Sequence, residues 1–109
     1  MNFNQLGVGE INPFPGPHTL LPIPAVYSEA IIGHQGLTIK QIFSRTFCYI
    51  FVPREEQNEE RVFQLSGSPD AVERCSLEIM SIVTEVQEFC NEKGETVSES
   101  SVYNFLEDR

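Results

Sequence analysis

Two glycines three residues apart constrain this chain most, because they separate two short apolar patterns of helical type. The sequence around them reads Ile31-Ile32-Gly33-His34-Gln35-Gly36-Leu37-Thr38-Ile39-Lys40-Gln41-Ile42. Glycine has no Cβ, so such a pair permits a sharp bend and the close approach of another backbone. A helix that begins directly after the bend points N–H groups and its positive dipole end at the loop, where a phosphate is favoured.

Apolar periodicity in the rest of the chain predicts an α+β domain with three strands and three helices. In chain order we expect a strand over 18–23, helices over 28–32 and 38–45, strands over 46–52 and 61–65, and a long helix that starts at Ser68-Pro69-Asp70. Pro22 cannot donate to a strand ladder, so the first strand should lie at a sheet edge, whereas the proline-free third strand can be central. Ser28 and Ser68 are the expected N-caps of their helices.

The terminal segments differ from this periodic region. Residues 1–17 are rich in Gly and Pro without periodicity, and we expect a flexible lead-in that one apolar side chain ties to the domain. The side chains available for that contact are Phe3, Ile11 and Phe14. The domain itself should span 18–90, followed by a tail over 91–109 that contains a short helix. The apolar residues at helical spacing in the tail are Val102, Phe105 and Leu106. This helix either docks on its own domain or serves as a linear motif for a partner.

The charge of the chain argues against strong non-specific binding of nucleic acid. It carries 16 acidic and 7 basic residues, for a net charge of −9. Neutralisation of phosphates by basic residues supplies most non-specific affinity for nucleic acids. A chain of this composition therefore binds nucleic acid weakly, through a local site, or not at all.

The reactive side chains indicate neither a metal site nor an enzyme. Cys48, Cys75 and Cys90 occupy apolar positions and are typical of reduced core thiols, as in a cytoplasmic or nuclear protein. The sequence has no Cys-x-x-Cys, no Walker loop and no nucleophile–base pair, so we expect no metal, no cofactor and no catalysis. It also has no secretory signal and no apolar run of membrane-spanning length.

Taken together, these segments resemble the type I KH domain, a module that binds single-stranded nucleic acid. The resemblance covers about residues 18–90. It rests on Ile23-Pro24, Ala30-Ile31-Ile32-Gly33-His34-Gln35-Gly36-x-x-Ile39-Lys40-x-Ile42, Arg45-Thr46, Tyr49-Ile50, Arg61-Val62-x-x-Leu65-x-Gly67 and Ala71-Val72. It implies the order β-α-α-β-β-α, with a three-stranded antiparallel sheet packed against three helices. The run Thr46-Phe47-Cys48-Tyr49-Ile50-x-x-Pro53-Arg54, the acidic loop after it and Arg61-Val62-Phe63 are most similar to MEX-3-type KH domains.

The resemblance also implies a groove for about four nucleotides of single strand, with the glycine loop against the backbone. The apolar floor for the bases would be Ala30, Ile32, Ile39 and Val52. The residues that meet phosphates would be Gly33, His34, Gln35 and Gly36. Lys40 would add charge, Arg61 would read base edges through its guanidinium, and Arg54 and Tyr49 would line the wall.

Each of these assignments has a structural alternative, and the sequence departs from the family in places. The floor residues equally fit a core, Lys40 and Arg61 fit surface charges, and Tyr49 fits strand packing. The loop carries His34-Gln35 where binding-competent members usually carry Lys or Arg, and Glu29 stands where the family often has glycine. Two functions therefore stay open. One is the binding of single-stranded RNA, or of single-stranded DNA, in post-transcriptional regulation of mRNA. The other is a degenerate acidic KH domain that binds a protein partner or forms a homodimer through exposed edge strands.

Overall fold

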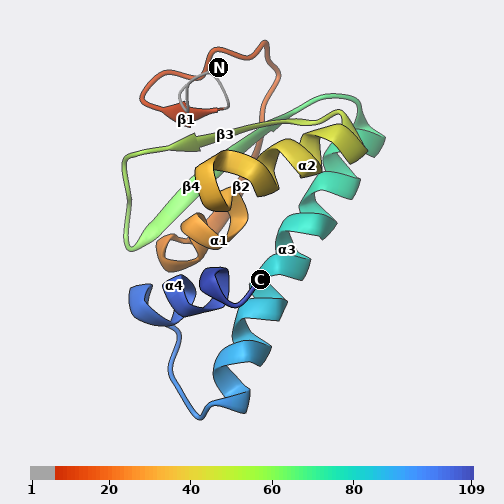
Figure 1. Cartoon of the computed structure of the whole chain (residues 1–109). Helices are drawn as coiled ribbons and strands as arrows, with labels where there is room; N and C mark the ends of the chain where they lie inside the picture. The colour runs from red at the N-terminus through yellow and green to blue at the C-terminus, as the bar shows by residue number, and fades with distance from the viewer. Residues whose placement is uncertain (1–6) are drawn as a thin grey trace.

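A computed structural model of the chain describes residues 7–109, which form a mixed α+β fold (Figure 1). The strands are β1 (Val8–Gly9), β2 (Thr19–Pro24), β3 (Tyr49–Pro53) and β4 (Glu60–Ser66). The helices are α1 (Ser28–Ile32), α2 (Leu37–Thr46), α3 (Pro69–Glu92) and α4 (Glu99–Glu107), with short 3₁₀ turns η2 (Ala25–Tyr27) and η3 (His34–Gly36). Between β2 and α3 the order of strands and α-helices is the expected one.

The sheet has the strand order β1-β3-β4-β2. β4 pairs antiparallel with both β2 and β3, so β2 lies at an edge and β4 is internal, as the proline pattern predicts. The expected three-stranded, wholly antiparallel sheet is wrong by one strand, because β1 adds to the outer edge of β3 in parallel. A two-residue strand carries no period that a sequence could reveal, and its pairing depends on the edge that β3 offers.

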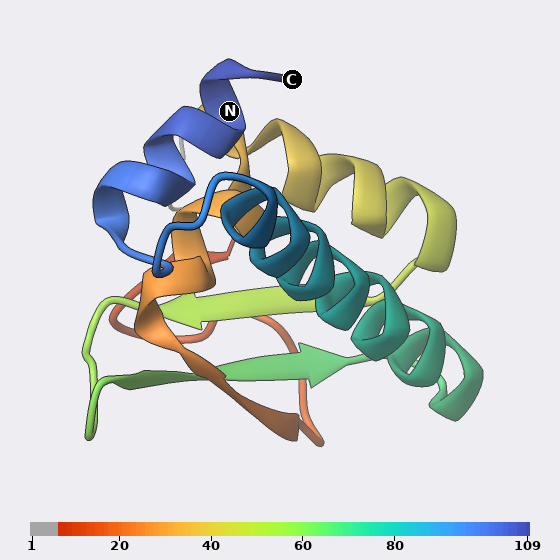
Figure 2. The same cartoon turned by 90° about the horizontal axis from the view of Figure 1, so that it is seen from below.

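The helices lie together on one side of the sheet (Figure 2). Their apolar stripes meet the inward side chains of β3 and β4 in one core, as the periodicity predicts. Fully buried members of this core are Ile31, Ile42, Phe63, Leu65, Ile79 and Val86. The three helices expected within the domain are α1, α2 and α3, and the tail forms the short helix α4, which packs against α1 and α3.

The helix starts agree only in part with the sequence. Ser68 caps α3 as predicted, since its hydroxyl accepts a hydrogen bond from the Ala71 N–H at 3.1 Å. Ser28 is wrong as an N-cap, although α1 has the predicted bounds. The 3₁₀ turn η2 runs directly into α1, so Tyr27 precedes the helix in a helical conformation. The Ser28 hydroxyl is consequently buried with no hydrogen-bond partner among the described atoms.

The tail helix α4 docks on its own domain. Ser98 and Ser101 form a reciprocal capping box at its start. Val102 and Phe105 are buried, and the Phe105 ring meets the Phe89 ring of α3 edge-on, with centroids 5.6 Å apart. Within the described part of the chain this apolar face is therefore not available as a free linear motif.

The segment before β2 also contacts the domain. The Phe14 ring stacks on the Tyr49 ring at 4.7 Å, and Asn12 donates a hydrogen bond to the Gln64 side chain at 2.9 Å. Ile11 stays 85% exposed and makes no anchor, while Phe3 lies outside the described residues. Of the three expected anchoring residues, the structure therefore assigns the contact to Phe14.

The three cysteines are free and buried, as predicted for core thiols. In residues 7–109 no three His, Cys, Asp or Glu side chains gather closely enough to hold a metal ion. Over the same range, no helix combines the length and the apolar character that crossing a membrane requires.

Candidate nucleic-acid interface

The loop between α1 and α2 can only be built with glycine at Gly33. This residue has φ 79° and ψ 174°, and a Cβ placed on it would lie 2.2 Å from Thr38 Oγ1 and 2.8 Å from the Thr38 amide nitrogen. Gln35 and Gly36 are also left-handed, with φ of 52° and 77°. The chain therefore reverses direction within four residues and brings the start of α2 against the end of α1.

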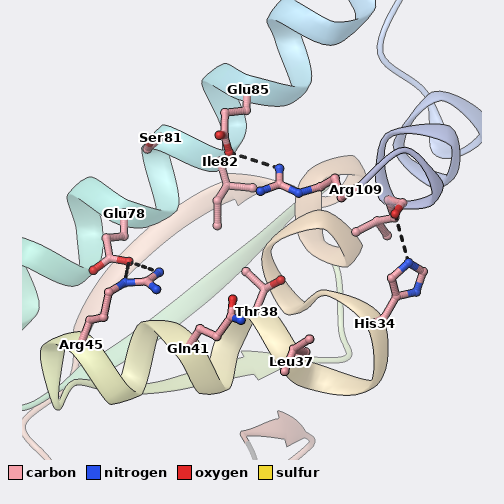
Figure 3. Close-up of a pocket in the computed structure, with 11 residues that line it drawn as sticks. His34, Leu37, Thr38, Gln41, Arg45, Glu78, Ser81, Ile82, Glu85 and Arg109 are labelled. Atoms are coloured by element: carbon pink, nitrogen blue, oxygen red, sulfur yellow. Dashed lines mark hydrogen bonds and ion pairs between the residues drawn. The ribbon is translucent and has the colours of Figure 1, made fainter.

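The loop leads into α2 without a side-chain cap, and the Leu37 N–H at the helix start donates to the His34 carbonyl. Gly36 precedes α2 and has no side chain with which to cap it, so the positive end of the helix dipole faces the loop. His34 and Gln35, the two residues between the glycines, are exposed. His34 Nε2 lies 3.1 Å from the Leu106 carbonyl oxygen of α4, which ties the loop to the tail helix (Figure 3).

A hollow of about 850 Å³ lies beside this loop. Its walls come from the glycine loop, from η2 and α1, from the β3–β4 loop and from α4. Its lining includes Glu29, Gly33, His34, Gln35, Glu56, Glu59, Arg61, Glu99 and Tyr103. The hollow thus brings together four of the residues that the sequence assigns to the interface, which are Gly33, His34, Gln35 and Arg61.

Carboxylates outnumber cations around this hollow. Its acidic side chains are Glu29, Glu56, Glu59 and Glu99. Arg61 is the single arginine or lysine among the residues that line the hollow. Two nitrogens of its guanidinium form hydrogen bonds. Nη1 donates to the Pro53 carbonyl at 3.1 Å, and Nη2 meets a Glu56 carboxylate oxygen at 3.3 Å. The third nitrogen, Nε, is buried with no partner among the described atoms, while Nη1 and Nη2 each carry a second N–H beyond these two bonds.

The four expected floor residues are closed off from solvent in this structure. Ala30, Ile32, Ile39 and Val52 are exposed by 2%, 3%, 3% and 0%. They belong to the main core, and the half-buried Val8 of β1 packs against the same cluster. In the strand register Val8 lies opposite Val52. In this conformation a base cannot reach these four side chains.

The remaining expected residues do not line the hollow. Lys40 is exposed on α2, and Arg54 is exposed directly after β3. Tyr49 is 41% exposed and sits in an aromatic group, between Phe14 and the Phe43 ring at 5.0 Å. Its packing role is therefore visible, whereas a role as a stacking platform stays a prediction.

Several lining residues were missed by sequence reasoning. Glu56 and Glu59 belong to an acidic run that is typical of a solvated loop, and Glu99 and Tyr103 come from the tail. The apolar spacing of the tail predicts a helix but not where it docks. A second hollow of about 400 Å³ between α2, α3 and α4 is crossed by the ion pairs Arg45–Glu78 and Arg109–Glu85 (Figure 3). Exposed pairs of this kind contribute little stability.

Comparison with known proteins agrees with this geometry. The KH domain family model matches residues 18–81. The mouse RNA-binding protein MEX3D is 35% identical over 71 residues, which confirms the similarity to MEX-3-type domains. The mouse and human Tudor and KH domain-containing proteins are 38% identical over 63 residues. These matches cover 64% and 58% of this chain but only 11% of each relative. With more than half of its length matched by the family model, the chain belongs to the KH domain family.

Proposed function

We propose that this chain is a single-stranded RNA-binding domain of the type I KH topology, folded over residues 18–90, in which the loop Gly33–Gly36 holds the RNA backbone. The conformation of that loop carries the proposal. Gly33 has no room for a Cβ, and the loop leads straight into the uncapped start of α2. Backbone N–H groups at a helix start suit a phosphate even where the loop has no fixed positive charge.

Arg61 is the side chain we assign to base recognition. Its guanidinium is held at the wall of the hollow by Pro53 and Glu56, so its orientation is set before RNA arrives. Nη1 and Nη2 each carry a second N–H beyond these bonds, which can donate to a carbonyl or ring-nitrogen acceptor of a base. His34 and Gln35 would contact phosphates or sugars, and Lys40 would add charge along α2.

We place this binding in the post-transcriptional regulation of mRNA in the cytoplasm. The similarity to MEX3D, which is named as an RNA-binding protein, supports the RNA binding on which that role depends. The negative net charge predicts modest affinity for an isolated domain, because few phosphates can be neutralised. Binding of several nucleotides by neighbouring modules would raise the affinity without any new contact in this one.

The test is a titration of randomised short single-stranded RNA at low and moderate salt. The double variant His34→Asp/Gln35→Asp changes two exposed side chains and leaves both glycines in place. We expect at least a tenfold loss of affinity. The matched control, Leu77→Asp/Asn91→Asp, adds the same two negative charges at exposed positions of α3. Equal losses in both variants, or no binding by the unmodified chain at low salt, would contradict the proposal.

A second function is favoured by the charge of the hollow. Four carboxylates against one arginine repel phosphates and suit a basic protein segment better than RNA. In that case the domain is a protein-interaction module that has kept the KH fold. Light scattering over a range of concentrations, followed by capture of partners, distinguishes it. A strict monomer that captures no protein and binds RNA would exclude this second function.

A further inference from the structure

The outer edge of β3 is already occupied by the chain's own N-terminal segment. The Val52 amide donates to the Gly7 carbonyl, and the Arg54 amide donates to the Gly9 carbonyl at 2.9 Å. Unpaired N–H groups on a sheet edge accept an extended peptide as an added strand. They equally suit the acceptor atoms of a base, so the two donors nearest the proposed groove floor are used up.

The same segment lies beside Val52, the β3 residue of the expected floor. Val8 lies opposite Val52 and packs against the core cluster that contains Ala30, Ile32 and Ile39. Its approach is close because Gly7 has φ 100° and a Cβ placed there would lie 2.0 Å from the Ile50 carbonyl oxygen. Only glycine allows the chain to enter β1 at this point.

Beyond β1 the segment continues around the edge onto the outer face of the sheet. Asn12 reaches the Gln64 side chain, and Phe14 stacks on Tyr49. Phe51, which pairs with Gln64 in the sheet, is only 2% exposed although it stands outside the main core cluster. Figure 1 shows this red segment lying along β3, away from the helices.

The attachment of β1 itself is nevertheless small. β1 has two residues, its side-chain contact is one half-buried valine, and Glu10 and Ile11 after it are exposed. Segments with few buried apolar contacts open locally at a much lower free energy than the whole domain. A competing ligand that supplies hydrogen-bond acceptors and a flat apolar surface can therefore replace it.

We propose that residues 7–14 act as an internal competitor of RNA, occupying the strand side of the groove until RNA displaces β1. This inference rests on the proposed RNA-binding function. It accounts for the occupied strand edge beside Val52, and it gives the exposed loop residues His34 and Gln35 a role in first contact. RNA would meet the loop first and reach the floor only when the segment leaves.

Two glycine variants of the full chain test this competition. Gly7→Ala places a methyl group against the Ile50 carbonyl oxygen and should release β1. Gly9→Ala is the matched control, because its Cβ would meet only a Phe51 ring atom at 4.0 Å. If the open state is populated at about 10%, release raises the apparent RNA affinity about tenfold. We expect that gain for Gly7→Ala alone, together with faster hydrogen exchange at the Val52 and Arg54 amides.

The unmodified chain supplies a second measurement that does not depend on either variant. Saturation with short single-stranded RNA should move the Val8 and Gly9 amide resonances to positions typical of an unstructured chain. If RNA binds while Val8 keeps its original resonance, the competition is refuted and the RNA-binding function stands. The competition is refuted in the same way if Gly7→Ala frees the edge without changing affinity. If β1 is released but no chain binds RNA at low salt, both proposals fail.

Discussion

The two ends of the chain are held to the same domain by different means. α4 is fixed by side-chain burial, with Val102 and Phe105 inside the core and a capping box at its start. The N-terminal segment is fixed mainly by backbone hydrogen bonds to β3 and by one aromatic stack. A buried side chain needs a partner surface of complementary shape, whereas a backbone N–H can donate to any acceptor that reaches it. We therefore expect α4 to stay attached to the domain and β1 to be the segment that a ligand can displace.

The largest effect should come from α4. Phe105→Ala removes a buried ring that packs on Phe89, and we expect a loss of about 3 kcal/mol in the free energy of unfolding. Urea unfolding followed by circular dichroism measures it. Tyr103→Ala on the same helix, where the side chain is 63% exposed, should change stability by less than about 0.5 kcal/mol. Equal small losses of stability for both variants would mean that the buried face does not hold α4 on the domain.

The start of α4 should contribute less than its core face. Ser98→Ala removes the acceptor for the Ser101 amide and breaks the capping box, so we expect about 1 kcal/mol of destabilisation. Ser100→Ala, at an exposed position within the first turn, is the control and should be neutral. The same urea titration applies. No difference between the two serines would show that the cap is not needed once the helix is docked.

Phe14→Ala should loosen the N-terminal segment while barely affecting the domain. The lost stack with Tyr49 should make local opening easier by about 1 kcal/mol, whereas global stability should fall by less than about 0.5 kcal/mol. Hydrogen exchange at the Arg54 amide reports the first quantity, and urea unfolding the second. Ile11→Ala should change neither. A large global loss would mean that the segment is an integral part of the core and not exchangeable.

The smallest effect concerns the contact between the glycine loop and α4. His34→Ala removes the hydrogen bond to the Leu106 carbonyl, and since this contact is exposed we expect about 0.5 kcal/mol. Gln35→Asn introduces a residue that tolerates the left-handed conformation of this position, so it should leave stability unchanged. Amide shifts over the last turn of α4 should move only in the His34 variant. Shifts throughout α4 would indicate that the loop, not the buried face, positions the helix.

Elements with strong local signals were predictable from the sequence. The bounds of α1 and the cap of α3 follow from apolar spacing and from Ser68-Pro69, and the edge position of β2 follows from Pro22. β1 was not predictable, because its glycines indicate flexibility and its strand exists only against the edge of β3. The prediction of Ser28 as an N-cap failed because the 3₁₀ turn η2 before it continues directly into α1.

The candidate site was predictable where it is local and not where it is assembled from distant segments. The residues of the glycine loop lie together because they are neighbours in the chain. Arg61 joins them at the hollow, as the resemblance implies. The burial of Val52 and the position of Tyr103 at the hollow depend on how β1 and α4 dock on the domain. No spacing of residues in the sequence reveals this docking.

The parallel pairing of β1 with β3 also bears on how the protein behaves in concentrated solution. Cys48-Tyr49-Ile50-Phe51-Val52 is uncharged, free of proline and rich in strand formers, which is typical of segments that self-associate as stacked strands. Its outer edge is the one that β1 covers, while the opposite edge, β2, carries Pro22 and Pro24. A chain whose β1 is detached with nothing in its place would therefore be prone to aggregate, so a variant that releases β1 is best handled dilute or saturated with ligand.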